Sequence, residues 1–191
     1  MSTGHDLAPF DAAASATPDT KDWTWVLEQP CPDCGFVSGS VPRTALGQTL
    51  RAQLPTWRAV VTGEGARTRP DPGTWSPTEY ACHVRDVQRV FGERVRAVVA
   101  AVDEPARFAN WDQDATAVQA RYDLADPATT LAELEAGVLE VADLYDGLDA
   151  DDEALWAQRG LRSNGSAFTL ETLAAYHLHD VVHHGWDVAP G

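Results

Sequence analysis

The spacing of apolar residues predicts a helix over about residues 42–61. Apolar side chains recur there every three or four positions, as one face of a helix requires. These residues are Leu46, Leu50, Leu54, Trp57 and Val61. Pro55 falls inside the stretch and should kink or shorten the helix, because proline has no N–H to donate to the preceding turn.

The second predicted helix has the clearest start signal in the chain. Ser76 is a candidate N-cap, Pro77 occupies the first helical position, and Glu79 completes a capping box. The apolar face that follows is formed by Tyr80, Val84, Val87, Phe91, Val95, Val98 and Val102. We therefore expect a long helix whose first turn is firmly fixed.

Two further helices complete the pattern. One begins at Asp126-Pro127 and reaches about Leu148, and a shorter helix over about residues 115–122 precedes it. The last runs from near Thr169 to about Trp186, after a loop or hairpin over residues 159–166. Four amphipathic helices predict an all-α fold, a four-helix bundle.

The N-terminal region has a different character. Residues 1–22 are small and polar, and we expect a flexible tail there. Residues 23–191 would form a single domain with an irregular N-terminal extension and a bundle core over about 43–188. In that extension, Cys31-Pro-Asp-Cys34 resembles half of a zinc knuckle, but no second cysteine pair supplies the other two ligands. An inert turn, a reversible disulfide and a metal role all remain open for this pair.

Composition narrows the range of partners. Fourteen basic residues face twenty-nine acidic ones, which gives a net charge of −15. Nucleic acids and anionic membranes need clustered basic residues, so neither is an expected partner. No apolar run is long enough to span a membrane, and the first residues do not resemble a secretory signal. We expect a cytoplasmic protein with a small-molecule substrate, which could form a homodimer.

The last predicted helix carries four of the six histidines, at positions 177, 179, 183 and 184. On a helix, His179 and His183 point the same way and could grip one divalent cation. Asp180 and His184 form a competing pair at the same spacing. His177 would lie on the apolar side of this helix. The ordinary alternative is that these histidines are core residues hydrogen-bonded to carboxylates.

A third metal ligand must come from another helix. His83 lies at the edge of the apolar face of the second predicted helix, pointing toward the bundle interior. His83, His179 and His183 would give three imidazoles and leave the fourth position of a tetrahedral ion open, as in catalytic zinc sites.

These residues resemble the motifs of the DinB-like superfamily. Trp75-Ser-Pro-Thr-Glu79, followed by His83, is similar to its W-S-x-x-E-x-x-x-H helix start, and the run from His179 to His184 is similar to its C-terminal His-x-x-x-His element. The resemblance covers residues 43–188. It implies a four-helix bundle with Zn²⁺, or alternatively Ni²⁺, on His83, His179 and His183. Many members have a glutamine shortly after the histidine pair, where this chain has Gly185-Trp-Asp187, so the Asp180/His184 register stays open.

The resemblance also implies an activity. Characterised relatives include S-transferases that use bacillithiol, mycothiol or glutathione, and a mycothiol-dependent maleylpyruvate isomerase. We therefore expect a metal-dependent thiol S-transferase whose metal activates a low-molecular-weight thiol. Residues that could line the mouth of its site are Trp111, Asp114, Arg121 and Arg162. The alternatives are a thiol-dependent isomerase, or a non-catalytic, stress-related bundle that binds a metal or another ligand.

Overall fold

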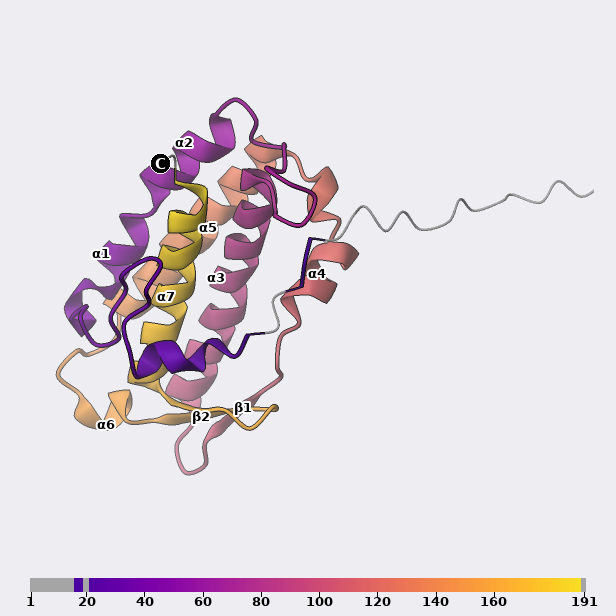
Figure 1. Cartoon of the computed structure of the whole chain (residues 1–191). Coiled ribbons are helices and arrows are strands. Elements are labelled where there is room, and N and C mark those ends of the chain that lie inside the picture. The colour runs from indigo at the N-terminus through magenta and orange to yellow at the C-terminus, as the bar shows by residue number, and fades with distance from the viewer. Residues whose placement is uncertain (1–15, 19–20, 190–191) are drawn as a thin grey trace, which may run out of the picture.

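The computed structural model describes residues 16–18 and 21–189, and it confirms the predicted all-α bundle. Within these residues the long helices lie side by side, as Figure 1 shows. They are α3 (Pro77–Ala100), α5 (Pro127–Asp146), α7 (Leu170–Val188) and the pair α1 (Leu46–Arg51) and α2 (Leu54–Thr62).

The first predicted helix is broken, as its internal proline indicated. A short 3-10 turn, η3 (Arg43–Ala45), leads into α1, and the chain restarts as α2 with Pro55 in its first turn. Proline is tolerated at that position because the N–H groups of the first turn have no partner within the helix.

The start of α3 is fixed by a complete capping box. The Ser76 side chain accepts from the Glu79 N–H, and the Glu79 carboxylate accepts from the Ser76 N–H at 2.9 Å. Arg69 donates to the same carboxylate at 2.9 Å through Nε, so this buried charge is paired. The cap sets the register of α3 and therefore the position of His83, one helical turn after Glu79.

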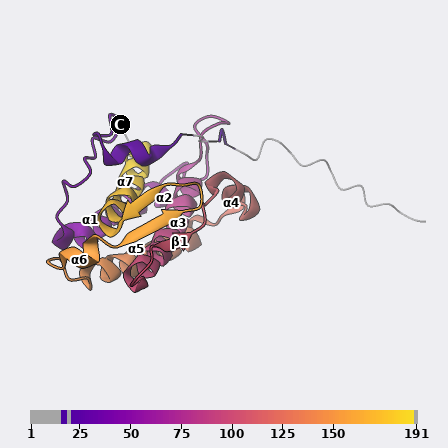
Figure 2. The same ribbon diagram turned by 90° about the horizontal axis from the view of Figure 1, so that it is seen from below.

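A small three-stranded sheet lies across one end of the bundle, seen from below in Figure 2. It contains β1 (Ala106–Phe108), β2 (Arg159–Arg162) and β3 (Ala167–Thr169). The predicted loop or hairpin is the antiparallel β2–β3 hairpin, and β1 pairs with β2 in parallel. Three shorter helices occupy the connections: α4 (Gln113–Gln119), η4 (Tyr122–Leu124) and α6 (Glu153–Trp156).

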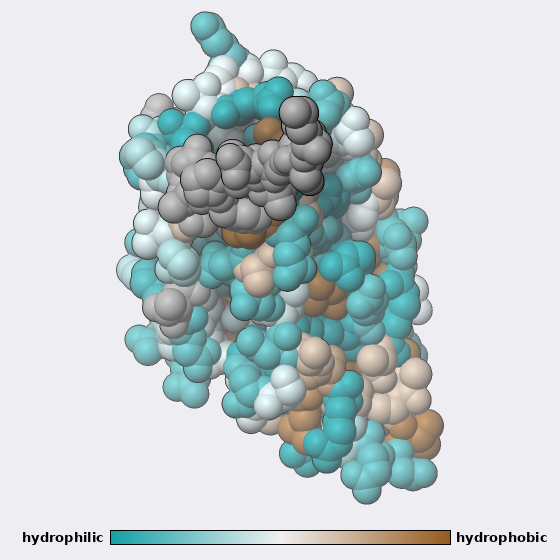
Figure 3. Space-filling view, turned by 90° about the vertical axis from the view of Figure 1, so that its right-hand side faces the viewer, coloured by the Kyte–Doolittle hydropathy of each residue, from teal (hydrophilic) through white to brown (hydrophobic). Residues whose placement is uncertain are grey.

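The core lies between α3, α5 and α7, with the α1–α2 pair packed against it. Its fully buried apolar side chains include Val87, Leu134, Val138, Leu173 and Val181. The polar sides of α3 and α5 face solvent, whereas most of the polar residues of α7 are buried or half-buried. Hydrophilic residues accordingly cover most of the face in Figure 3, and hydrophobic ones form small patches.

The N-terminal extension crosses the outside of α7. Its 3-10 helix η2 (Trp23–Leu27) packs against α7, and both ribbon views place the two side by side (Figures 1 and 2). The tail predicted for residues 1–22 falls mostly outside the described residues. Every helix in the described ranges is too short or too polar to span a lipid bilayer.

The contact between α1 and α5 generates a first prediction. A Cβ added at Gly47 would lie 2.6 Å from the Ala142 carbonyl oxygen and would also clash with the Asp146 side chain. Gly47→Ala should therefore lower the free energy of unfolding by about 1–3 kcal/mol, although alanine is the better helix former. Chemical denaturation would measure this loss. Gln48→Ala, at an exposed position of the same helix, should stay within about 0.5 kcal/mol of wild type; equal stability of both variants would contradict the close packing.

Candidate metal centres

The structure divides the residues of the histidine-rich run between two sides of α7. His83, Asp180 and His184 form one group, and Cys31, Cys34, His179 and His183 form another. Within each group, one ligand atom from every residue lies within 4.8 Å of all the others. The division follows from helix geometry, because two pairs offset by one residue point about 100° apart.

The first group has the spacing that a single metal ion requires. Asp180 Oδ1 lies 3.3 Å from His83 Nε2 and 3.6 Å from His184 Nε2. Two nitrogen or oxygen ligands on one tetrahedral zinc ion, each bound at about 2.0–2.1 Å, lie roughly 3.3 Å apart. Two imidazoles and a carboxylate also suit Zn²⁺ or Ni²⁺ chemically. The residues therefore fit a divalent ion with one open coordination position.

His83 is held rigidly at the bottom of this group. It is fully buried, and its ring stacks on Trp111 at 5.3 Å between centroids and contacts Trp75 at 5.4 Å. Burial lowers the pKa of His83, so the ring is neutral, the form in which imidazole binds metals. The capped start of α3 and the two indole rings together fix where its Nε2 points.

Asp180 is an ionised carboxylate. Burial would raise the pKa of Asp180, but the hydrogen bond from His83 and the electrostatic effect of the His83, His184 and His177 rings outweigh burial and lower that pKa to about 2. The Asp180 carboxylate therefore supplies a negative charge throughout the physiological pH range.

His184 is oriented by a second carboxylate. Its Nδ1 lies 2.8 Å from Asp187 Oδ2. Because a carboxylate only accepts, Nδ1 carries the proton and donates it, which leaves the Nε2 lone pair facing Asp180. A histidine whose second nitrogen donates to a carboxylate is the usual arrangement around protein-bound metals.

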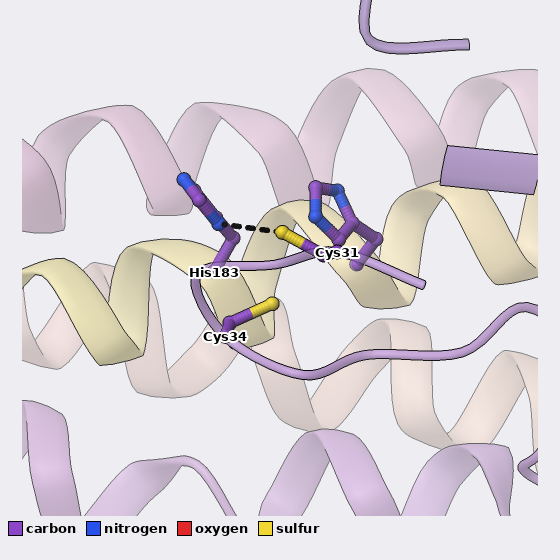
Figure 4. A group of neighbouring side chains, drawn as sticks. Cys31, Cys34 and His183 are labelled. Atoms are coloured by element: carbon purple, nitrogen blue, oxygen red, sulfur yellow. Dashed lines mark hydrogen bonds between the residues drawn. The ribbon is translucent and has the colours of Figure 1, made fainter. Parts of the chain in front are cut away.

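The second group joins the N-terminal extension to α7. Cys31 Sγ lies 3.6 Å from His183 Nδ1. Figure 4 shows this contact, with Cys34 beside the two residues. Burial, and then the neighbouring His183, lower the pKa of His179 to about 4. In the absence of a metal, burial raises the pKa of the Cys34 thiol to about 11, against the opposing hydrogen bond from the Phe36 backbone.

The structure thus does not bring His83, His179 and His183 into one metal-binding group of the described residues. His83 meets the competing pair, Asp180 and His184, because that side of α7 faces α3. His179 and His183, on the neighbouring side of α7, lie instead beside the Cys31/Cys34 pair. The Cys-x-x-Cys spacing was the signal for these histidines, because a structural zinc site with two cysteines needs two further ligands from elsewhere in the chain.

The other two sulfur and imidazole groups are core residues. His177 is fully buried, stacks on Phe91 at 4.9 Å, and has Nδ1 3.1 Å from the Tyr145 hydroxyl. Cys82 is buried with its sulfur 3.6 Å from Thr130 Oγ1. His177 lies on the apolar side of α7, where the helical pattern placed it.

A polar cleft of about 420 Å³ is lined by Trp111, the ring that stacks on His83. Three of the four predicted mouth residues, Trp111, Asp114 and Arg162, line it together with Tyr176. The fourth, Arg121, lies elsewhere and pairs with Asp123 at 2.8 Å. Trp111 contributes both to the cleft and to the packing around His83, so the cleft adjoins the candidate metal position.

A helical bundle with such candidate metal sites has known relatives. The sequence profile of the DinB superfamily matches residues 45–188, and the chain belongs to that superfamily. Its fold is similar to that of YfiT from Bacillus subtilis, described as "a probable metal-dependent hydrolase with an unusual four-helix bundle topology". The TM-score is 0.61 at 18% identity, over 76% of this chain and 85% of that one. No curated protein matches the sequence.

The orientation of His184 generates a second prediction. Asp187→Asn removes the charged acceptor of its Nδ1–H and should weaken metal binding at the first group by about 10–100-fold. Competition with a chromophoric chelator measures this affinity. Glu140→Gln removes an exposed carboxylate on α5 and should leave it unchanged. Equal affinities for the two variants would show that Asp187 does not support the ligand.

The placement of His177 generates a third. His177→Ala should lower the free energy of unfolding by about 2–4 kcal/mol, since it leaves a cavity against Phe91 and Tyr145. Folded His177→Ala should retain all the metal of the wild type, measured by inductively coupled plasma mass spectrometry. A loss of metal from the folded variant would contradict its assignment to the core.

Proposed function

We propose that this protein is a divalent-metal-dependent enzyme, and that it transfers a low-molecular-weight thiol of the mycothiol type to an electrophilic small molecule. The observation that carries the proposal is the convergence of His83, Asp180 and His184, with Trp111 between His83 and a polar cleft. Three protein ligands and a fourth, open position are the pattern of catalytic rather than structural zinc.

The chain's own residues would hold the ion and keep it in place. His83 and His184 offer ring nitrogens, Asp180 offers a negative oxygen, and Asp187 orients His184. When bound, the ion acts as a Lewis acid that lowers the pKa of a thiol, so that thiolate is available at neutral pH. The indole rings around His83 keep water from its buried side and preserve the geometry.

The cleft is suited to a polar co-substrate. Asn110, Arg162 and Asn164 present amide and guanidinium groups to it, and Trp111 and Tyr176 offer flat apolar faces. Arg162 is held in place by hydrogen bonds of 2.9 Å to Asn164 Oδ1 and to Ser166 Oγ. These groups could bind the hydroxyls and carboxylates of a large hydrophilic thiol and orient its sulfur toward the metal position.

The proposed reaction is a substitution at carbon. The thiolate sulfur attacks the electrophilic carbon and forms a C–S bond, and the leaving group departs with the electrons of the bond that breaks. The thiol proton passes to water. The protein positions the two reactants, which is itself a large part of the rate enhancement available to such an enzyme.

Hydrolysis is the second candidate, supported by the fold shared with YfiT, whose description names a probable hydrolase. His83, Asp180 and His184 would then hold an ion that supplies Lewis-acid activation of water instead of a thiol. A non-catalytic metal-binding bundle would need neither the open position nor the cleft.

The proposed thiol transfer leads to a fourth prediction. Protein loaded with Zn²⁺ or Ni²⁺ should consume mycothiol and a halogenated aromatic electrophile together, faster than the uncatalysed reaction. His83→Ala should return the rate to background because it removes a ligand. Arg89→Ala, at an exposed position of α3, should retain the wild-type rate.

The outcomes separate the candidates. A thiol-independent cleavage of activated esters or amides that His83→Ala abolishes would replace the transferase with the hydrolase. Metal binding without turnover of any thiol, ester or amide would contradict both proposed enzymatic activities.

A further inference from the structure

The cysteine pair and the second pair of α7 histidines form a separate site, distinct from the proposed catalytic one. We propose that Cys31, Cys34, His179 and His183 bind one Zn²⁺ in a closed, structural site that fastens the N-terminal extension to α7. This inference does not depend on the proposed enzymatic activity.

The donor set and its spacing are those of structural zinc sites. Cys31 and Cys34 are separated by two residues and His179 and His183 by three, within the ranges found for such cysteine and histidine pairs. Two thiolates and two neutral imidazoles also balance the charge of Zn²⁺ completely. A neutral complex suits a buried position, where an uncompensated charge would be costly.

The local backbone presents both sulfurs to the same point. The Cys31 N–H donates to the Phe36 carbonyl and the Gly35 N–H donates to the Cys31 carbonyl, each at 2.9 Å. Gly35 has a φ of 73°, a conformation that glycine adopts without strain. The result is a tight turn that carries a cysteine on either side, and Figure 4 shows both sulfurs next to His183.

The distances match one tetrahedral ion. Sulfur and nitrogen ligands of zinc, bound at about 2.3 Å and 2.0–2.1 Å, lie roughly 3.5–3.6 Å apart. Cys31 Sγ and His183 Nδ1 are separated by 3.6 Å, and atoms of all four residues gather within 4.8 Å. The Nε2 of His179 is buried and has no hydrogen-bond partner among the described residues, which leaves a polar atom that coordination chemistry could satisfy.

Aromatic rings enclose the group. Trp23 lies over both imidazoles, with centroid distances of 5.6 Å to His179 and 4.9 Å to His183. Phe36 meets the His179 ring edge-on at 5.6 Å, and Trp186 covers His183 at 5.9 Å. Four protein ligands under this cover leave no position for substrate, so the site is structural rather than catalytic.

The site would hold together the parts that build the proposed catalytic cleft. The extension contributes Lys21, Asp22 and Trp23 to the cleft wall. Asp187 also lies between the two groups: Oδ2 accepts from His184 Nδ1 at 2.8 Å, and Oδ1 is 3.8 Å from His183 Nε2. Zinc on the cysteine side would therefore fix both the wall of the cleft and the register of the neighbouring ligands.

Cobalt titration of the full-length metal-free chain tests the proposal and provides the fifth prediction. Wild-type protein should bind two equivalents of Co²⁺, one of which gives thiolate-to-cobalt charge-transfer absorption in the near ultraviolet. The C31S/C34S double variant should lose one equivalent and this absorption. His184→Ala should lose the other equivalent and retain the absorption, and Cys82→Ser should keep both.

A measurement on the wild type covers the case in which the cysteine variant does not fold. Under native conditions, zinc-loaded protein should resist thiol-modifying reagents, and a chelator should release zinc as two thiols become reactive. Reactive cysteines in the zinc-loaded protein, or a Cys31–Cys34 disulfide in metal-free protein isolated under reducing conditions, would overturn the proposal. So would thiolate absorption that persists in the double variant.

Discussion

The register of α7 determines both candidate metal centres. Four potential ligands occupy positions 179, 180, 183 and 184, and each site takes two of them, four residues apart. A rotation of the helix by a single residue would turn His179 and His183 toward α3 in place of Asp180 and His184. The N-cap at Thr169 and the buried side chains of Leu173 and Val181 hold the helix at one rotation. The chemistry therefore depends on apolar packing elsewhere on the same helix.

Buried imidazoles are costly in a core unless each nitrogen has a partner. Along α7, hydrogen bonds meet this requirement only in part, because they give three of these rings a partner on one nitrogen each. His177 is placed against the Tyr145 hydroxyl, His184 against Asp187, and His83 approaches α7 at Asp180. The second nitrogens of His83 and His177 have no hydrogen-bond partner among the described residues, whereas coordination would give one to the buried Nε2 of His179. A metal would therefore stabilise the folded chain as well as prepare it for chemistry, because a ligand that binds only the native state favours folding.

The helices could be predicted from the sequence because their signals are local. Capping residues, prolines and apolar spacing placed α3, α5 and α7 to within a few residues, and Pro55 marked the break between α1 and α2. The strand β1 has three residues and pairs with a segment about fifty positions later, so no local sequence pattern predicts this strand.

Which residues belong to each site could be decided only from the three-dimensional arrangement. Helical spacing identified two equally good pairs on α7, but only packing decides which pair meets His83. The path of the extension likewise brings Cys31 within reach of His183, 152 positions away. Residue types and spacings indicated metal chemistry, whereas the assignment of each ligand to a site depended on contacts between distant segments.

The helix α7 carries candidate ligands for two separate ions. A crystal structure of zinc-loaded protein, with diffraction measured on both sides of the zinc absorption edge, tests this assignment most directly. The account predicts two anomalous peaks, one among His83, Asp180 and His184 and the other among Cys31, Cys34, His179 and His183. A single peak bound by His83, His179 and His183 would contradict it.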